Sequence, residues 1–348
     1  MINFRYHIVS LIAVFLALAI GVIMGSAVID RAIVNRLEDQ QRSLENRLTG
    51  IEGENDDLRS ENRLLRTTAE RLAEQGSERL LADTLTGVPV LVVAERGAES
   101  SGFDDLLSLL GTSGADQRGT IWLDDRFALD KNDERRDLAT ALHEPATASV
   151  ESLRSLALAR LAAYVRDGVG AADATDPSAT TTSTTAPVTT TTEASAITAE
   201  EAFGALRDAG FIDFDAPEGA SGDAGPVLTP GTRLIVLSGP GAKVAPDIVA
   251  VPLTKLLLGS GATAGADAPA ISLLAAEDRG VEAPKAGFTV ALRRDKDVAE
   301  RLSTVDNIGD FAGRLAAVLA LVDLGAGRVG HYGTGPGAQR LLPAPPEK

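Results

Sequence analysis

The hydropathy pattern is dominated by one apolar run near the N-terminus. Residues 8–29 contain no charged side chain, and a helix needs about 20 predominantly apolar residues to cross a bilayer. The run therefore predicts a membrane-spanning helix. Arg5 precedes it, which favours a cytoplasmic tail at residues 1–7 and export of the rest. The alternative is a signal peptide with a cleavage site at Gly25–Ala27, but the run exceeds the usual 7–15-residue apolar core of such peptides.

A seven-residue apolar repeat follows the run and extends over residues 30–78. Leucine or isoleucine occupies six successive d positions, and asparagine occupies two of the a positions. This pattern predicts a parallel two-stranded coiled-coil stalk, and the G-x-x-x-G pair in the run would allow close helix approach. An amphipathic helix packed on its own domain is the alternative. The residues predicted to form the dimer contact are Gly21, Gly25, Leu37, Leu44, Ile51, Asn55, Leu58, Asn62, Leu65 and Leu72.

Short β-branched runs then alternate with helical patterns, which predicts an extracytoplasmic α/β domain at residues 87–342 with a mostly parallel sheet. A short tail at 343–348 follows it. Strands are expected at 87–97, 119–125, 232–239, 269–276 and 287–294, and helices at 102–110, 134–142, 150–166, 199–209, 247–259 and 309–324.

A threonine-rich tract interrupts this alternation at residues 171–197. Nine of the fifteen residues from Ser178 to Thr192 are threonine, and such a composition offers too little apolar surface to offset the entropy of ordering. The tract therefore predicts a disordered insert. It either separates two α/β halves or forms one loop of a single sheet, and we favour the single sheet because neither half alone supplies a full one.

Composition limits the kinds of binding and catalytic site that the chain can form. A net charge of −16 argues against nucleic-acid binding. Cysteine is absent, and the chain has two methionines and three histidines, so a soft-metal site has few ligands. The sequence contains neither a phosphate-binding loop motif nor a nucleophile elbow, and we expect no enzymatic activity and no cofactor. The weak candidates for a metal or carboxylate-based site are His143, His331, Asp124 and Asp125.

The C-terminal segment is rich in glycine. Gly325, Gly327 and Gly330 match the dinucleotide-binding pattern G-x-G-x-x-G, but they follow a helical pattern, whereas that motif follows a strand and opens a helix. We interpret the segment as a helix cap and a loop packed on the sheet, with His331 and Tyr332 as packing residues. The alternative is a partner-binding loop formed by Gly330, His331, Tyr332, Gly333 and Gly335.

Both ends of the chain resemble one actinobacterial family. Residues Arg5–Ser26 and Ser303–Ala338 are similar to the terminal signatures of the MctB-like family, named after the mycobacterial copper transport outer-membrane protein B. The resemblance implies copper efflux or homeostasis in the cell envelope, with copper as the only implied ligand. Some relatives are associated with a membrane partner in daughter-cell separation.

Two functions follow from these observations. The first is a non-enzymatic envelope protein of copper homeostasis that does not itself bind copper tightly. The second is a dimeric scaffold that holds the α/β domain away from the membrane to bind another envelope or cell-wall partner. An enzyme with a site built around Asp124 and Asp125 is a third, weaker alternative.

Overall fold

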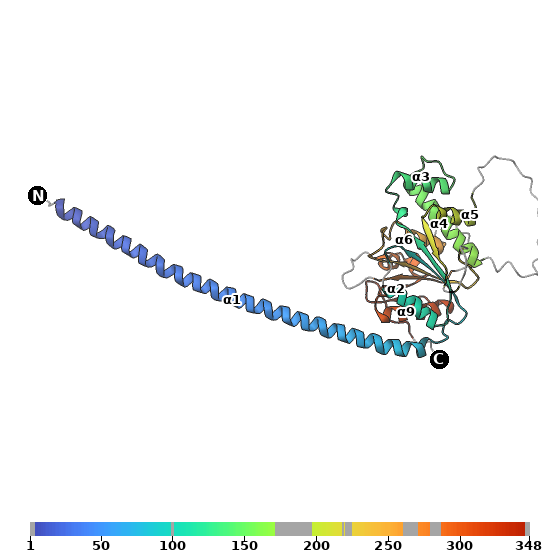
Figure 1. Cartoon of the computed structure of the whole chain (residues 1–348), viewed down its shortest axis with the longest axis horizontal. Helices are drawn as coiled ribbons and strands as arrows, with labels where there is room; N and C mark the ends of the chain where they lie inside the picture. The colour runs from blue at the N-terminus through green and yellow to red at the C-terminus, as the bar shows by residue number, and fades with distance from the viewer. Residues whose placement is uncertain are drawn as a thin grey trace, which may run out of the picture. The chain divides into compact units, whose positions relative to one another are not determined.

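The computed structural model divides the chain into two compact units, Met1–Leu72 and Ala73–Lys348. Most of the first unit belongs to helix α1 (Phe4–Leu81), and the second unit contains the α/β body (Figure 1). The predicted insert at 171–197 lies outside the described residues except for Ile197. The structure describes residues 4–98, 101–170, 197–217, 219, 225–259, 271–278 and 287–344.

Helix α1 contains both the predicted membrane span and the predicted stalk. One stretch of it, Tyr6–Gly25, is long and apolar enough to cross a membrane, and its side chains are exposed. The helix continues through Gly50 and Gly53 without interruption, although glycine lowers helix propensity by about 1 kcal/mol relative to alanine.

The body is built on one seven-stranded sheet with the order β3-β2-β1-β4-β5-β6-β7. Every neighbouring pair is parallel except β2 and β3. Strands from both sides of the threonine-rich tract therefore share a sheet, and the expectation of a mostly parallel α/β architecture is confirmed. The strands are β1 (Pro89–Glu95), β2 (Asp116–Leu123), β3 (Ile212–Asp215), β4 (Arg233–Ser238), β5 (Leu273–Glu277), β6 (Ser303–Val305) and β7 (His331–Tyr332).

Helices cover both faces of this sheet, because alternate residues of the central strands are apolar on each side. Leu91 and Val93 point to a face that we call the α4 face, and Val90 and Val92 point to the opposite α9 face. The α4 face is covered by α3 (Asn132–Ala141), α4 (Val150–Gly170), α5 (Ala199–Asp208), α6 (Ala250–Leu257) and α7 (Phe288–Arg294), and the α9 face by α2 (Ser101–Thr112) and α9 (Phe311–Gly325).

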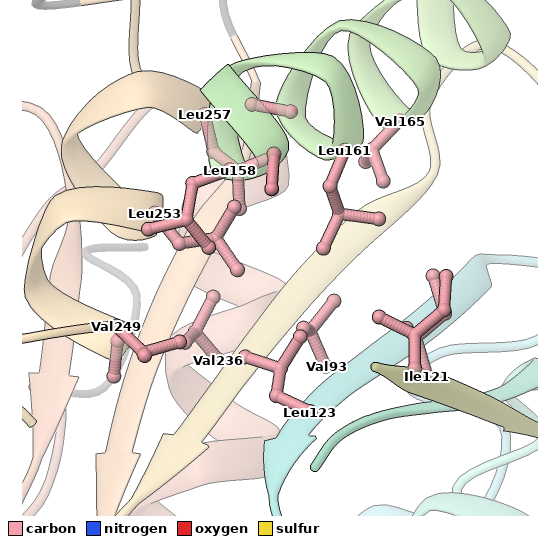
Figure 2. Packing of buried hydrophobic residues seen from close by; sticks show 14 of the residues in the cluster. Val93, Ile121, Leu123, Leu158, Leu161, Val165, Val236, Val249, Leu253 and Leu257 are labelled. Carbon is pink, nitrogen blue, oxygen red and sulfur yellow. The ribbon is translucent and has the colours of Figure 1, made fainter. Parts of the chain in front are cut away.

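The core of the α4 face is entirely aliphatic where α4 crosses the middle of the sheet. Figure 2 shows Leu158 and Leu161 of α4 and Leu253 of α6 directed at Val93 and Val236 of the strands. All five side chains are at most 1% exposed, and fully burying one such side chain contributes roughly 1.5–3 kcal/mol. This packing joins α4 and α6 to the central strands.

The strand predicted at 287–294 is wrong, because Phe288–Arg294 forms helix α7. The backbone N–H groups of Phe288 and Thr289 donate to the Glu277 carboxylate at 3.1 and 3.0 Å, which satisfies donors that a helix N-terminus leaves without partners. Phe288 and Leu292, four residues apart, then face the core together. The capping group comes from a neighbouring strand, so it is invisible in the local sequence pattern.

Candidate functional site

The carboxyl ends of the parallel strands carry a row of buried polar residues. In open α/β sheets, ligands bind at this edge, at the point where successive connections leave for opposite faces. That point lies between β1 and β4, because α2 follows β1 on the α9 face and α6 follows β4 on the α4 face. Buried polar residues at or just after the ends of β1, β4, β5 and β6 include Glu95, Ser238, Glu277 and Asp306.

Glu95 ends β1, and its carboxyl group is buried in the sheet edge. Its side chain is 2% exposed, and its Oε2 accepts a hydrogen bond from the Ser238 hydroxyl. Burial raises the pKa of Glu95 to about 7, against the lowering effect of the Ser238 hydroxyl and the Ala250 backbone, while the charge of Asp247 adds to the rise. Glu95 therefore changes protonation near neutral pH, and it does so inside the fold.

The other two carboxylates of the edge are held by structural contacts. Glu277 caps α7 and also accepts the Thr289 hydroxyl at 2.7 Å. Asp306 forms an ion pair with Arg293 at 2.6 Å, with side chains 0% and 3% exposed. It also accepts the backbone N–H of Thr334 at 2.9 Å. The edge is thus a packed polar layer that joins strands to helices and to the glycine-rich loop.

Asp306 explains why that loop needs glycine. Gly333 has φ 124° and lies against the Asp306 carboxylate, where an added Cβ would overlap Oδ1, and Gly335 donates its N–H to Asp306 Oδ2 at 3.0 Å. His331 and Tyr332 form strand β7 and are 8% and 7% exposed. The structure gives these two side chains packing positions, as in our first interpretation of the segment.

The four candidate metal residues lie in three separate parts of the body, because only Asp124 and Asp125 are neighbours. Asp124 follows β2 and accepts the N–H of Arg126 at 3.3 Å, and burial, with its neighbour Asp125, raises the pKa of Asp124. His143 is exposed in a turn after α3 with φ 57°. His331 lies on β7, where burial lowers its pKa.

The sheet order keeps these candidates apart. Four strands separate β2 from β7, which corresponds to about 24 Å at the usual spacing of neighbouring strands. Asp124 and His331 therefore share no site. Within the described ranges, no group of three or more histidine, cysteine, aspartate or glutamate side chains is placed to hold a metal ion.

The predicted dimer contacts lie along α1, and those whose side chains the structure describes are uncovered in the single chain. Leu44, Ile51 and Leu58 are 66%, 60% and 58% exposed, and Gly21 and Gly25 have open space where a Cβ would be. Asn55 and Asn62 are also exposed. The side chains of Leu37, Leu65 and Leu72 lie outside the described part of the chain.

A groove that the sequence did not reveal lies on the α9 face between α2 and β2. It has a volume of about 950 Å³ and is lined by residues of α2, β2 and the segment after β3. Trp122, the single tryptophan of the chain, forms part of its wall. An isolated tryptophan in a predicted strand was the one signal available in the sequence, but core tryptophans give the same signal.

Comparison with known proteins gives one consistent result. The family model described as "Copper transport outer membrane protein, MctB" matches residues 1–343. The proteins named "Copper transporter MctB" from Mycobacterium tuberculosis (strain H37Rv) and Mycobacterium bovis are each 29% identical over 98% of this chain and 99% of their own length. The protein of the same name from Mycobacterium leprae is 28% identical over the same shares.

Proposed function

Because the chain belongs to the MctB family of copper transport outer membrane proteins, we propose that it is a membrane-anchored envelope protein that takes part in copper efflux or homeostasis. The observation that carries this proposal is the family match over residues 1–343, which includes the apolar helix and the α/β body together. Copper is the cargo of this role, and no chemical transformation is part of it.

We further propose that the body does not itself bind copper(I) tightly. Copper(I) prefers cysteine and methionine sulfur, with imidazole next. From residue 30 onward the chain contains no sulfur and only His143 and His331, which lie on an exposed turn and on a buried strand. The donor set therefore does not fit a tight site, and the copper-related role would be exercised through a partner.

The topology follows from the first helix. Tyr6–Gly25 would anchor the chain as a single span, with the N-terminus inside and the α/β body outside the membrane. A single span forms no pore, because a membrane channel requires a helix bundle or a closed barrel. The proposed role is therefore that of one component of an envelope assembly.

The second candidate function is a dimeric scaffold for a membrane or cell-wall partner, for example in daughter-cell separation. The exposed d positions of α1 favour it. Leu44, Ile51 and Leu58 are seven residues apart and at least 58% exposed, and a parallel partner helix would cover such a stripe. The stalk would then hold two α/β bodies away from the membrane surface.

Two measurements test the proposed function. The first compares the copper tolerance of cells that lack the protein with that of cells complemented by the full chain. We expect tolerance to be restored, and unchanged tolerance in both strains would overturn the copper-related role.

The second measurement titrates the purified full chain in detergent against a chromophoric copper(I) chelator, beside a His143→Ala, His331→Ala double variant. We expect no stoichiometric competition by either protein. Sub-nanomolar binding that disappears in the double variant would show that the body holds copper directly, and restored tolerance without it would support the indirect role.

A further inference from the structure

The groove between α2 and β2 is an interaction surface that neither the family match nor the buried polar layer explains. We propose that it is a docking site for an extended, lysine- or arginine-bearing segment of a partner protein. This inference deepens the scaffold function and rests on it, because it names the chemistry of the partner. The residues that carry the argument are Phe103, Asp104, Leu107, Asp116, Trp122 and Asp215, all of which line the groove.

The first step is the shape of the groove and its apolar wall. Its volume of about 950 Å³ is at the upper end of the 300–1,000 Å³ usual for binding clefts. Phe103 packs edge-on against Trp122 with ring centroids 5.2 Å apart. The Trp122 Nε1–H donates to Asp215 Oδ2 at 2.5 Å, which fixes the indole in the wall. Phe103 and Trp122 are each only 4% exposed, so the half-buried Leu107 supplies accessible apolar surface for the hydrocarbon part of a long side chain.

The second step is the charge of the groove. Three of its lining residues are aspartates, Asp104, Asp116 and Asp215, and none of the lining residues is lysine, arginine or histidine. Asp104 is exposed and has no ionic partner among the described residues, whereas Asp116 pairs with Arg118 at 2.6 Å. An acidic rim above an apolar wall is complementary to lysine and arginine, whose stems are apolar and whose heads are cationic.

Besides Arg118, which pairs with the lining residue Asp116, a second cation lies near the groove, and its charge is also offset. The Arg96 guanidinium is 4.5 Å from the centre of the Trp122 ring, but it forms an ion pair with Asp213 at 2.8 Å. Of the three lining aspartates, Asp104 and Asp215 therefore keep charges without an ionic partner among the described residues. The net charge of −16 over the whole chain also favours association with basic partners.

The third step is the backbone at the end of the groove. β3 pairs with β2 only over Thr120–Leu123, so within the described ranges no strand pairs with the outer side of Asp116–Gly119. Pro217 follows β3 and lines the groove, and a proline has no N–H with which to continue the ladder. Extended peptides commonly bind along strand edges, where main-chain hydrogen bonds add to side-chain contacts.

The single tryptophan makes the proposal directly testable, because Trp122 lines the groove and is the one tryptophan of the chain. The probe is an N-acetylated, C-amidated peptide of alternating valine and lysine, and its matched control replaces every lysine with glutamate. With the full chain in detergent, we expect a saturable emission change for the lysine peptide only, weakened by high salt. A fluorescein-labelled lysine peptide, followed by anisotropy, detects binding that leaves the indole emission unchanged.

Three variants assign the binding to the groove. Asp104→Lys reverses the unpaired charge, and Ser108→Arg, on the exposed side of α2, fills the groove. We expect each to weaken the lysine peptide by about tenfold or more. The control is Asp133→Lys, which reverses a charge in the first turn of α3 on the other face of the sheet, just as Asp104 lies in the first turn of α2. We expect it to bind as the unmodified chain does.

The outcomes separate cleanly. The proposal would be overturned if both peptides bound equally or if neither readout showed saturable binding. It would also be overturned if Asp104→Lys and Ser108→Arg bound the lysine peptide as well as the unmodified chain does. A saturable response to magnesium or calcium chloride alone that competes with the peptide would also overturn it, since it would assign the groove to an inorganic cation. None of these measurements contains copper, so their failure is distinguishable from a failure of copper tolerance.

Discussion

Replacing Glu95 with glutamine tests the account of the buried polar layer, because it removes a titrating group and keeps its shape. Burial raises the pKa of Glu95 from 4.5 to about 7. For an acid whose pKa is raised by folding, the associated stability is fully present below the unfolded-state pKa and is lost as the pH rises through the folded-state value. One pKa unit corresponds to about 1.36 kcal/mol, so the loss amounts to about 3 kcal/mol between pH 4.5 and somewhat above pH 7.

The glutamine variant should lack this loss, since an amide does not ionise and its oxygen or NH₂ group can pair with the Ser238 hydroxyl. The assay is urea unfolding of the full chain in detergent, followed by Trp122 fluorescence at pH 5, 6, 7 and 8. We expect the free energy of unfolding of Glu95→Gln to exceed that of the unmodified chain by about 3 kcal/mol at pH 8. The difference should shrink towards pH 5.

The matched control is Glu277→Gln, at the end of β5. Glu277 accepts two backbone N–H groups and one hydroxyl, and an amide would turn a donor towards one of these donors. We expect this variant to lose about 1–3 kcal/mol at every pH tested. Parallel pH profiles for Glu95→Gln and the unmodified chain would refute the reasoning about Glu95.

Three further predictions concern the loop, the stalk and the anchor. Gly333→Ala should destabilise the body by about 1–3 kcal/mol in urea unfolding, because φ is 124° and the new Cβ would overlap Asp306 Oδ1. Gly327→Ala, whose Cβ would enter open space, should lower the free energy of unfolding by less. Equal losses for the two variants would contradict the role of Asp306. Ile51→Asp should convert the predicted dimer into a monomer in sedimentation of the detergent-solubilised chain, whereas a persisting dimer, or an unmodified chain that is already monomeric, would rule out a stalk contact at that position. N-terminal sequencing of membrane-extracted protein should find the anchor retained, and a start at Val28 would show that it is cleaved.

Features encoded by contiguous residues could be read from the sequence. The apolar run is continuous, and the heptad repeat has a fixed period along the chain. Each feature belongs to a single helix, and α1 contains both. Strands β1, β4 and β5 were also found, because a strand buried on both faces is a continuous apolar run. The family signature at the two ends of the chain is similarly local, and the match over residues 1–343 confirms it. The stalk dimer and the orientation of the chain stay predictions.

The shortest strands could not be read in this way. β3, β6 and β7 contain four, three and two residues, which is too short for a hydropathy period to stand out. Their strand conformation comes from pairing with neighbours already placed in the sheet. Thr304, for example, is opposite His331 only because β6 and β7 are adjacent.

The buried polar layer and the groove were decided by tertiary structure. Ser238 donates to Glu95 across 143 positions of sequence, and only the order of β1 and β4 in the sheet brings the two together. The segment 287–294 has a strand-like composition, yet most of it forms helix α7. The Glu277 carboxylate accepts the backbone N–H groups at the start of this helix. The hydropathy pattern along a chain indicates which side chains become buried on folding. A buried polar group needs a hydrogen-bond partner, because burial without one is costly. The strand order of the folded sheet determines which partner is close enough.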